Sequence, residues 1–396
     1  MIRRAFALAA AGLLTAVALP VGGPLTAPLE AQEIHRTQLH DYRVVTVADG
    51  FEVPWSMTWL PNGDMLVTER PGRLRIVRDG RLLPGAVPGV PEVYATGQGG
   101  LLDVVAHPEF ASNRMIYLSY SKPQGERAST TAVIRARFEN DRLSDVEEIF
   151  EAQASGAGHY GGRIVFDGEG HFFLSLGDRQ ARPAGDLEGH PAQDLSNHHG
   201  VVVRLNEDGS IPEDNPFVGQ AGVGQAGALP EIWSYGHRNS QGMAFHPETG
   251  ELWATEHGPQ GGDELNRIQP GLNYGWPVVG YGVNYRSGTA IHEGTTREGM
   301  EDPLHVWVPS IGTSGFMIYD GDAFPEWQGH VFAGGLSGER IDRIQIEDGR
   351  VFISETVFHH MGRVRDVRQG PDGLIYVALE ARGGDTTAVV RLEPVN

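Results

Sequence analysis

The sequence predicts an all-β fold, a six-bladed β-propeller with long loops at its mouth. One unit recurs, in which a turn with Pro, Asp or Gly precedes a short apolar strand, a polar break and a second strand. The six copies begin at Pro61, Pro108, Phe166, His246, Pro325 and Pro371. The chain also has 54 glycines, about double the usual share, as many tight turns require. Short strands repeated in six units, without an amphipathic helix of convincing length, are typical of a propeller.

Most copies are followed by a further strand that carries an Arg. These strands are expected at residues 74–77, 133–137, 202–205, 341–344 and 389–392. Two of them end in Asp79-Gly80 and Asp348-Gly349, and Asp-Gly is a strong hairpin signal. The spacing of the units is uneven, and the excess length lies between the third and fifth copies, which predicts long functional loops there. A two-sheet sandwich is the alternative fold, and the six-fold repeat argues against it.

The first 31 residues read as a secretory signal peptide, and residues 32–396 as the propeller domain. A basic start (Met1 to Arg4) precedes fifteen uncharged residues (Ala5 to Leu19), and the small residue Ala31 stands before Gln32. Fifteen apolar residues are short for a membrane span, so an uncleaved anchor is the weaker alternative. We therefore expect a periplasmic or secreted protein with no stable membrane anchor.

Composition narrows the function further. The chain has no Cys, which excludes a lipoprotein anchor, disulfides, a thiolate nucleophile and a soft metal site. The formal net charge is −20 without any basic block, which argues against nucleic acid or anionic lipid as a partner. Solubility accounts for most of that acidity, and we expect a monomer or a homodimer.

Several familiar catalytic motifs are missing. There is no Gly-x-Gly-x-x-Gly on a βα unit, no P-loop and no Gly-x-Ser-x-Gly elbow. Nicotinamide binding, nucleotide hydrolysis and serine esterase chemistry therefore lose support. The pair His198-His199 has no accompanying ligand at helical spacing and is interpreted as loop.

An acidic, glycine-rich turn over residues 256–264 indicates a calcium site. Glu256, Asp263 and Glu264 surround a Gly-Pro-rich stretch whose carbonyls are free to point outward, and Ca²⁺ prefers several carboxylate and carbonyl oxygens. Asp263 and Glu264, with Tyr274 in the next loop, form a candidate second, structural cation site. The alternative is a solvated acidic loop.

His159 is a candidate general base. It lies in a glycine-rich turn (155–163) directly before an apolar strand, and a neutral imidazole at a propeller mouth suits proton abstraction near pH 7. The alternative is a solvated turn histidine.

Arg238, beside Asn239 after an aromatic strand, is suited to planar or oxyanionic groups, with a salt bridge to a nearby acid as the alternative.

Three further polar residues are candidates for an anionic ligand. Gln98 is a lone amide in a glycine turn and carries little weight alone. Arg363 and Arg365 are two apart and hence on one face of a strand, where they repel each other unless an anion lies between them. Pairing with Asp366 or Glu355 is the competing interpretation.

In combination these motifs resemble the soluble PQQ-dependent sugar dehydrogenases of the aldose and glucose type, which are six-bladed propellers. The resemblance runs from about Val44 to Arg391 and rests on six motifs in family order. They are the stretches 97–102, 159–163, 236–242, 256–264, 273–277 and 362–366. It implies an enzyme that oxidises aldoses to lactones, with PQQ and Ca²⁺ as cofactors, an aldose substrate and a separate electron acceptor.

The resemblance also implies a role for each polar residue of these motifs. His159 is the base that takes the proton from the sugar C1 hydroxyl as hydride passes to the quinone. Arg238 stabilises negative charge on the reduced quinone, and Asn239 and Gln98 bond the cofactor. The catalytic Ca²⁺ is held by main-chain carbonyls of the 258–259 bend, and the guanidinium pair at 363 and 365 meets PQQ carboxylates.

For the acidic loop the resemblance implies that Gly258 and Pro259 supply those carbonyls. Asp263 orients Arg238 or the base, and Glu264 with Tyr274 holds a structural Ca²⁺. One position departs from the family. Ser337 stands where a Lys is usual, which is expected to weaken PQQ binding unless the neighbouring Arg340 substitutes.

Two other functions stay open at this point. A Ca²⁺-dependent lactonase on a similar propeller needs no redox cofactor, but leaves Arg363 and Arg365 unexplained. A non-catalytic sugar-binding propeller is favoured if Ser337 marks a degenerate cofactor site.

Overall fold

The computed structural model describes residues 33–219, 227–381 and 386–395. The signal peptide predicted over residues 1–31 lies outside the described residues. Within them, the chain forms one five-stranded and five four-stranded antiparallel sheets. Helices in this part of the chain are single turns, α1 (Phe110–Asn113), η1 (Pro191–Gln193) and η2 (Pro325–Trp327). No described helix is long and apolar enough to cross a membrane.

Each sheet is one blade, numbered here from the first inner strand in the chain. Blade 1 has β3 (Pro54–Trp59), β4 (Met65–Glu69), β5 (Arg73–Arg78) and β6 (Arg81–Leu82). Blade 2 has β7 (Leu101–Ala106), β8 (Met115–Pro123), β9 (Ser129–Glu139) and β10 (Arg142–Glu151). Blade 3 has β11 (Ile164–Phe166), β12 (His171–Leu176), β13 (Val201–Asn206) and β14 (Ile232–Tyr235).

The second half of the chain continues the series. Blade 4 has β15 (Ser240–Phe245), β16 (Leu252–Glu256), β17 (Asp263–Ile268) and β18 (His305–Trp307). Blade 5 has β19 (Thr313–Ile318), β20 (Val331–Gly335), β21 (Arg340–Glu347) and β22 (Arg350–His359). Blade 6 has β23 (Arg363–Gln369), β24 (Ile375–Glu380), β25 (Thr386–Pro394), β2 (Tyr42–Glu52) and β1 (Ile34–His35).

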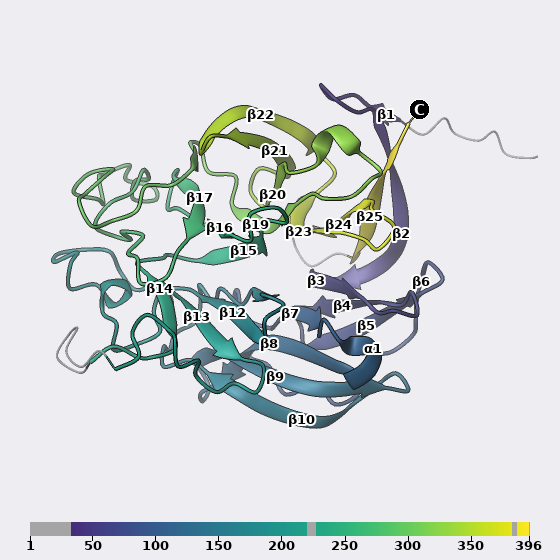
Figure 1. Ribbon diagram of the computed structural model, residues 1–396, viewed down its shortest axis with the longest axis horizontal. Coiled ribbons are helices and arrows are strands. Elements are labelled where there is room, and N and C mark those ends of the chain that lie inside the picture. Colours follow the sequence, from purple (N-terminus) through teal and green to yellow (C-terminus); the bar gives the residue numbers. More distant parts are fainter. Residues whose placement is uncertain (1–32, 220–226, 382–385, 396) are drawn as a thin grey trace, which may run out of the picture. The chain divides into compact units, whose positions relative to one another are not determined.

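The inner strands of the blades close into a ring (Figure 1). Each inner strand contacts its neighbours in the order β3, β7, β11, β15, β19, β23 and back to β3. The ring is closed by both ends of the described chain, because β2 pairs with β25 in register, with Val45 opposite Arg391. This arrangement confirms the predicted six-bladed propeller.

The recurring sequence unit corresponds to the hairpin between the first and second strand of every blade. The Arg-bearing strands are the third strands of their blades. Asp79-Gly80 and Asp348-Gly349 form two-residue hairpins with φ of 52° and 70°, and 49° and 72°. Such positive φ values at both central residues belong to the hairpin turn that matches strand twist. The hairpin turns predicted at these two Asp-Gly pairs are therefore confirmed.

A buried ion-pair network crosses the middle of the ring. Arg163 of blade 3 is 2% exposed and donates to Asp103 of blade 2 and to Asp366 of blade 6, each at 3.0 Å. Arg368 donates to the same two carboxylates at 3.0 Å. Because blades 3 and 6 lie opposite each other in the ring, these bonds span its axis and hold the inner strands together.

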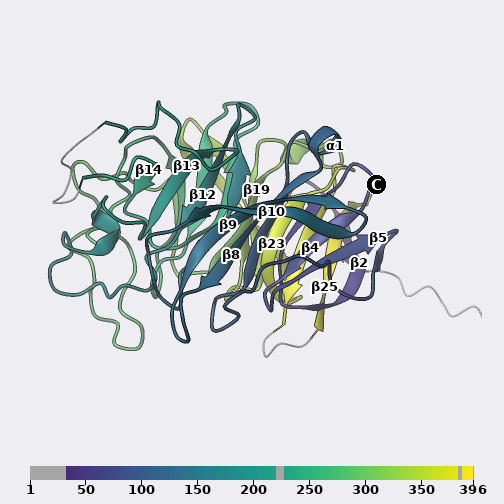
Figure 2. The same cartoon turned by 90° about the horizontal axis from the view of Figure 1, so that it is seen from below.

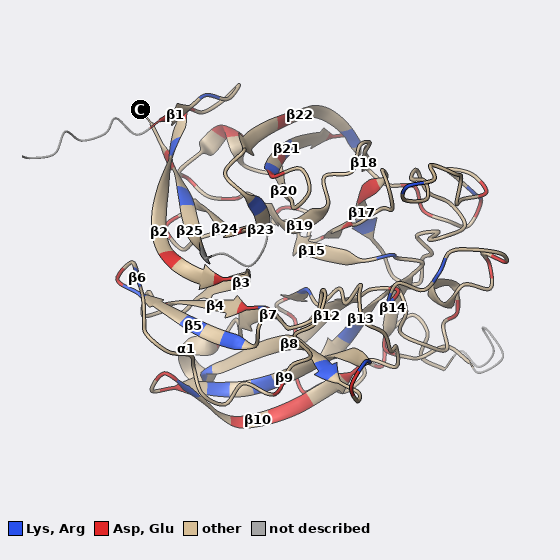
Figure 3. Ribbon diagram, turned by 180° about the vertical axis from the view of Figure 1, so that it is seen from behind, with Lys and Arg blue, Asp and Glu red and all other residues tan. Residues whose placement is uncertain are grey.

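The long loops predicted between the third and fifth copies are present. They include residues 177–200 after β12 and 269–304 after β17, and the second contains the sequence around Tyr274. These loops extend from the side of the ring where β14 lies (Figure 2). Charges of both signs are interspersed on the outer strands, where acidic β10 lies beside basic β9 (Figure 3).

Candidate active site

A cavity of about 960 Å³ opens at one end of the ring, where the inner strands begin. Every blade contributes a residue at or just before its inner strand, so the repeat itself brings distant sequence positions together. The contributors are Trp55, Gln98, His159, Arg238, Gly312 and Arg363, from blades 1 to 6 in order. This volume suits a ligand the size of an organic cofactor.

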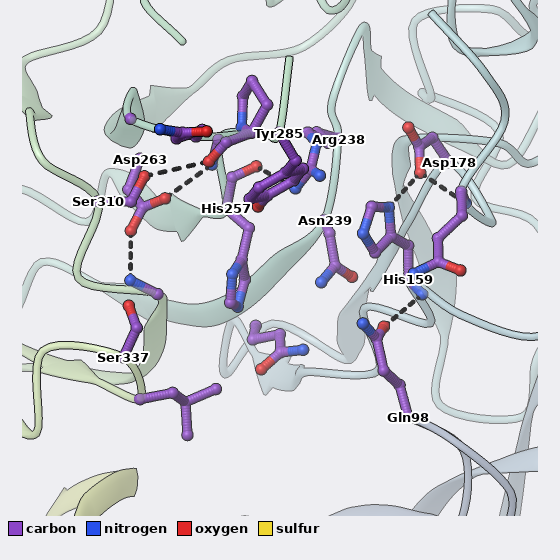
Figure 4. Close-up of a pocket in the computed structure, with 18 of the residues that line it drawn as sticks. Gln98, His159, Asp178, Arg238, Asn239, His257, Asp263, Tyr285, Ser310 and Ser337 are labelled. Atoms are coloured by element: carbon purple, nitrogen blue, oxygen red, sulfur yellow. Dashed lines mark hydrogen bonds and ion pairs between the residues drawn. The ribbon is translucent and has the colours of Figure 1, made fainter. Parts of the chain in front are cut away.

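His159 and Asp178 form a buried pair on one side of the cavity (Figure 4). Nδ1 of His159 lies 2.5 Å from a carboxylate oxygen of Asp178. The other oxygen of Asp178 accepts the indole N–H of Trp276 at 2.8 Å. Gly177 allows this approach, since a Cβ there would lie 2.2 Å from the His159 carbonyl oxygen. The contacts fix the imidazole with its Nδ1–H on the carboxylate and its Nε2 lone pair free.

The surroundings hold this pair in a defined charge state. Burial lowers the pKa of His159, against the raising effect of the Asp178 hydrogen bond, and the Arg238 charge lowers it again. Burial is the largest single effect on Asp178 and raises its pKa, but the hydrogen bond and charge of His159, with the Arg238 charge, together outweigh it, so the pKa lies below its usual value. At neutral pH the pair is therefore a carboxylate beside a neutral imidazole, which can accept a proton.

Gln98 and Asn239 flank this pair with amide groups of known orientation. The side-chain oxygen of Gln98 accepts the backbone N–H of His159 at 2.7 Å. That of Asn239 accepts the N–H of Gly161 at 3.0 Å. Because backbone donors fix both oxygens, the NH₂ groups are the free ends, and in the described chain neither has a protein acceptor. Both amides line the cavity as hydrogen-bond donors.

Arg238 places a fixed cation in the cavity. Its backbone N–H donates to Glu256 at 2.7 Å, and its guanidinium donates to the His257 carbonyl at 3.1 Å and lies 5.2 Å from the Trp276 ring centre. Within the described residues the guanidinium has no ion pair. The salt bridge considered as an alternative from the sequence is therefore absent there, and the charge is available to a ligand.

Arg363 and Arg365 lie together, as expected for one face of a strand, but the carboxylate that they share is Glu380. Arg365 donates twice to one oxygen of Glu380, at 2.8 and 2.5 Å, and Arg363 donates to the other at 3.2 Å. Neither Asp366 nor Glu355, the partners considered from the sequence, takes part. Two guanidiniums share one carboxylate, which leaves one positive charge in excess at the cavity wall.

Asp263 fixes the bend at Gly258 and Pro259. Its carboxylate accepts the N–H of Gly258 at 2.9 Å and, with its other oxygen, that of Gly312 at 2.6 Å. These bonds join the bend to the start of β19, and they do not reach Arg238 or His159. The carboxylate that contacts the candidate base is Asp178, which the sequence reasoning missed.

The 258–259 bend offers main-chain oxygens to a hard cation. No described N–H donates to the carbonyl of Gly258, and that of Pro259 accepts only a 3.4 Å contact from Ser310. Both residues line the cavity. Carbonyl oxygens without partners are ligands that Ca²⁺ accepts, so the donor set fits the ion that the sequence suggested.

A second, smaller cavity of about 20 Å³ lies behind the bend, between two carboxylates. Asn266 donates to Glu256 at 2.8 Å and to Glu264 at 3.2 Å. Burial raises the pKa of Glu264 well above its usual range, and the neighbouring Glu256 charge adds to this. The amide oxygen of Asn266 is buried without a partner. The space suits a single cation that would balance these carboxylates.

Tyr274 lines the same small cavity, but its hydroxyl is committed to backbone. It donates to the Arg267 carbonyl at 2.5 Å and accepts the N–H of Gln269 at 2.8 Å. Among the described residues there is no cluster of three or more His, Cys, Asp or Glu side chains placed to hold a metal ion. A cation here would therefore depend on main-chain and amide oxygens beside the carboxylates.

Ser337 lies in the cavity wall, opposite His159 in the view of Figure 4. Its neighbour Arg340 pairs with Asp342 at 2.8 Å and is not among the described residues that line the cavity. Arg340 therefore does not supply the cation that Ser337 lacks.

Comparisons with known proteins show which family and which folds the chain is similar to. A family model described as glucose/sorbosone dehydrogenase matches residues 51–390. The chain is 42% identical to the aldose sugar dehydrogenase YliI of Escherichia coli over 87% of this chain and 92% of that protein. An apo-form crystal structure of the soluble aldose sugar dehydrogenase from Escherichia coli is 38% identical, with a TM-score of 0.80 over 89% of this chain and 100% of that one. A PQQ-bound aldose sugar dehydrogenase from Streptomyces coelicolor is 29% identical, with a TM-score of 0.69 over 89% and 98%.

Proposed function

Because the chain belongs to the glucose/sorbosone dehydrogenase family, we propose that it oxidises aldoses at C1 to lactones with PQQ and Ca²⁺. The observation that carries the proposal is the His159–Asp178 pair. It is a neutral base held by a buried carboxylate at the wall of a cavity that also contains unpaired positive charge. The proposal is further supported by the relatives, which are named as aldose and glucose dehydrogenases.

His159 performs the proton transfer in this proposal. Its Nε2 accepts the proton of the sugar C1 hydroxyl, while the C1 hydrogen leaves with two electrons as hydride and the C1–O bond becomes a carbonyl. Asp178 keeps the proton on Nδ1 and stabilises the imidazolium that forms. When bound, PQQ would supply the quinone that takes up the hydride, and Ca²⁺ would supply a Lewis acid to it.

Arg238 and the two amides position and stabilise charge in this proposal. The Arg238 guanidinium opposes negative charge that develops in the cavity, and its contact with the His257 carbonyl holds it there. Gln98 and Asn239 present NH₂ donors to cofactor oxygens. Arg363 and Arg365 would bind carboxylates of PQQ, a role consistent with their excess charge.

The cation sites are assigned in the same way. The carbonyls of Gly258 and Pro259 would hold the catalytic Ca²⁺. Glu264, with the main chain at Tyr274, would hold a structural Ca²⁺ that balances two buried carboxylates. Asp263 acts on the bend through the backbone amide of Gly258 rather than on the base.

The cellular location of the protein is a separate proposal. We propose that residues 1–31 direct export to the periplasm and are removed, leaving a propeller of residues 32–396. Cell fractionation and N-terminal sequencing of the exported chain test it. Export with a new N-terminus close to Gln32 supports the proposal, and a cytoplasmic chain that keeps Met1 contradicts it.

A dye-reduction assay with a panel of aldoses, with and without PQQ, tests the proposed function. Turnover of aldoses that requires PQQ supports it. Hydrolysis of lactones in the absence of PQQ would favour the calcium-dependent lactonase. Binding of sugar with no turnover under either condition would favour the non-catalytic propeller.

A further inference from the structure

The part of the cavity wall formed by blades 1 and 6 carries three guanidinium groups and one carboxylate. Arg70, Arg363 and Arg365 all line the cavity. The carboxylate is Glu380, which both Arg363 and Arg365 contact. Arg70 was not singled out in the sequence, since it follows an ordinary second strand, β4, and the next strand, β5, carries several further arginines.

The backbone and stem of Arg70 are held firmly in place. Its N–H donates to the Val53 carbonyl at 3.0 Å, and its carbonyl accepts the N–H of Leu101 at 3.1 Å. Gly100 packs directly on the side chain, because a Cβ at that glycine would lie 1.9 Å from the Arg70 carbonyl oxygen and 2.5 Å from its Cγ. Gly100 belongs to the same turn as Gln98. The glycines of this turn thus allow Arg70 to pack against blade 2, beside Gln98, a candidate cofactor-binding residue.

The guanidinium of Arg70 differs from its neighbours because it has no protein partner in the described chain. Arg73 and Arg75, three and five residues later, both pair with the buried Glu69, at 2.6 and 3.1 Å. Arg70 makes no such hydrogen bond or ion pair, although its charge acts on Arg365 and Glu380 and lowers the pKa of both. An arginine that faces a cavity without a partner is available to a ligand.

The charges at this wall do not balance without an anion. Glu380 offsets one of the three guanidiniums, so two positive charges remain close together. Like charges at short distance in a partly buried site repel each other. Ser337 of blade 5 follows Leu336, whose carbonyl accepts from Arg363 at 3.5 Å, and it adds a hydroxyl and no charge to the cavity. Two ligand carboxylates would neutralise these two excess positive charges.

We propose that Arg70 is a third carboxylate-binding arginine of the cofactor site, completing with Arg363 and Arg365 a cradle for the carboxylates of PQQ. The inference rests on the proposed function, since PQQ is the tricarboxylate that this function requires. In this assignment Arg70, and not Arg340, supplies the cation that Ser337 lacks.

Calorimetric titration of PQQ into the EDTA-treated protein, with Ca²⁺ restored, tests the assignment. Arg70→Gln is expected to raise the Kd for PQQ about ten- to a hundred-fold, as the loss of a charge-assisted hydrogen bond predicts. Arg70→Lys keeps the charge and is expected to recover part of that loss. The difference in PQQ affinity between Arg70→Gln and the unmodified protein should also become smaller at higher salt concentration, because salt screens the charge of Arg70.

Arg81→Gln is the matched control. Arg81 lies in the same blade at the opposite end of its sheet, is exposed, and is not among the described residues that line the cavity. The Kd of Arg81→Gln for PQQ should stay within about twofold of that of the unmodified protein, because the charge of Arg81 is distant and screened. Thermal unfolding of each variant checks that the fold is intact, and little change in Tm is expected for Arg70→Gln because no protein partner is lost.

The outcomes are distinguishable. A Kd for Arg70→Gln equal to that of the unmodified protein overturns the role of Arg70 and leaves the proposed function standing. Equal losses in Arg70→Gln and Arg81→Gln overturn it as well, since the effect would then be one of net charge. If the unmodified protein does not bind PQQ, the proposed function itself fails, and the assignment of Arg70 fails with it.

Discussion

Nδ1 of His159 lies 2.5 Å from a carboxylate oxygen of Asp178. The two residues stand on different segments, one before the inner strand β11 and the other after β12, and only the pairing of those strands brings them together. Their contact decides which ring nitrogen of His159 carries the proton, and therefore which one can accept a proton from a substrate.

Replacing His159 by Ala should abolish turnover and leave the cofactor bound. The side chain supplies the base, whose contribution is about a hundred- to ten-thousand-fold in rate, whereas the other predicted PQQ contacts are untouched. Dye reduction with an aldose measures the rate and calorimetry measures PQQ binding. His246→Ala, at a blade turn away from the cavity, is the control. Near-normal activity of the His159 variant would refute the assignment of the base.

Asp178→Asn should lower kcat/KM by about a hundred- to ten-thousand-fold, since an amide can donate to Nδ1 and so favour the wrong tautomer of His159. It should also move the acid limb of the pH–rate profile. The carboxylate raises the pKa of His159, so its loss lowers that pKa further, and the residual activity should persist to lower pH. A pH–rate profile that does not move would show that Asp178 does not act through His159.

Glu264→Gln should remove most of the stabilisation that Ca²⁺ confers. In the unmodified protein a bound cation offsets two buried carboxylates, so added Ca²⁺ is expected to raise Tm. The variant keeps the shape but has one charge fewer at the small cavity. Glu248→Gln, exposed in the same blade, should retain the full Ca²⁺ response. An undiminished response in Glu264→Gln would exclude the site.

Glu380→Gln should destabilise the cofactor-free protein and enlarge the stabilisation by PQQ. Arg365 is 6% exposed and Glu380 is 7% exposed, and removing one partner of such a buried pair costs about 3–5 kcal/mol. The two guanidiniums then lose their only carboxylate partner in the described chain and keep neutral acceptors, Gln241 for Arg365 and the Leu336 carbonyl for Arg363, so ligand carboxylates gain importance. Thermal unfolding with and without PQQ measures both effects. Equal PQQ-dependent shifts in Tm for the two proteins would argue against carboxylate binding at this wall.

The fold was readable from the sequence because each blade repeats one local signal. The turns at Pro61 and Pro371 and the Asp79-Gly80 hairpin depend on neighbouring residues alone, so they are visible without tertiary information. The closure of blade 6 was not predicted. It pairs β2 with β25, and no pattern in either strand specifies a partner more than three hundred residues away.

The candidate site was predicted in part. Arg363 and Arg365 were placed on one face by strand alternation, but their partner follows from the register, in which Arg363 stands opposite Glu380. Asp366, adjacent in sequence to Arg365, bonds Arg163 near the axis instead. Sequence distance thus favoured the wrong acid.

Asp178 was missed for a related reason. It lies nineteen residues after His159, across two strands and their turn, and a single Asp carries no motif of its own. Its position after a Gly at the end of an apolar strand was the available signal. In a propeller the second strand of a blade ends at the mouth, so a polar residue directly after it is a candidate site residue.

Reconstitution of aldose-dependent dye reduction is the most direct measurement of the central claim. Protein treated with EDTA is assayed alone, with Ca²⁺, with PQQ, and with both. The account predicts turnover only when both are added. Aldose oxidation without PQQ, or no oxidation of any aldose with both present and PQQ shown by calorimetry to be bound, would contradict it.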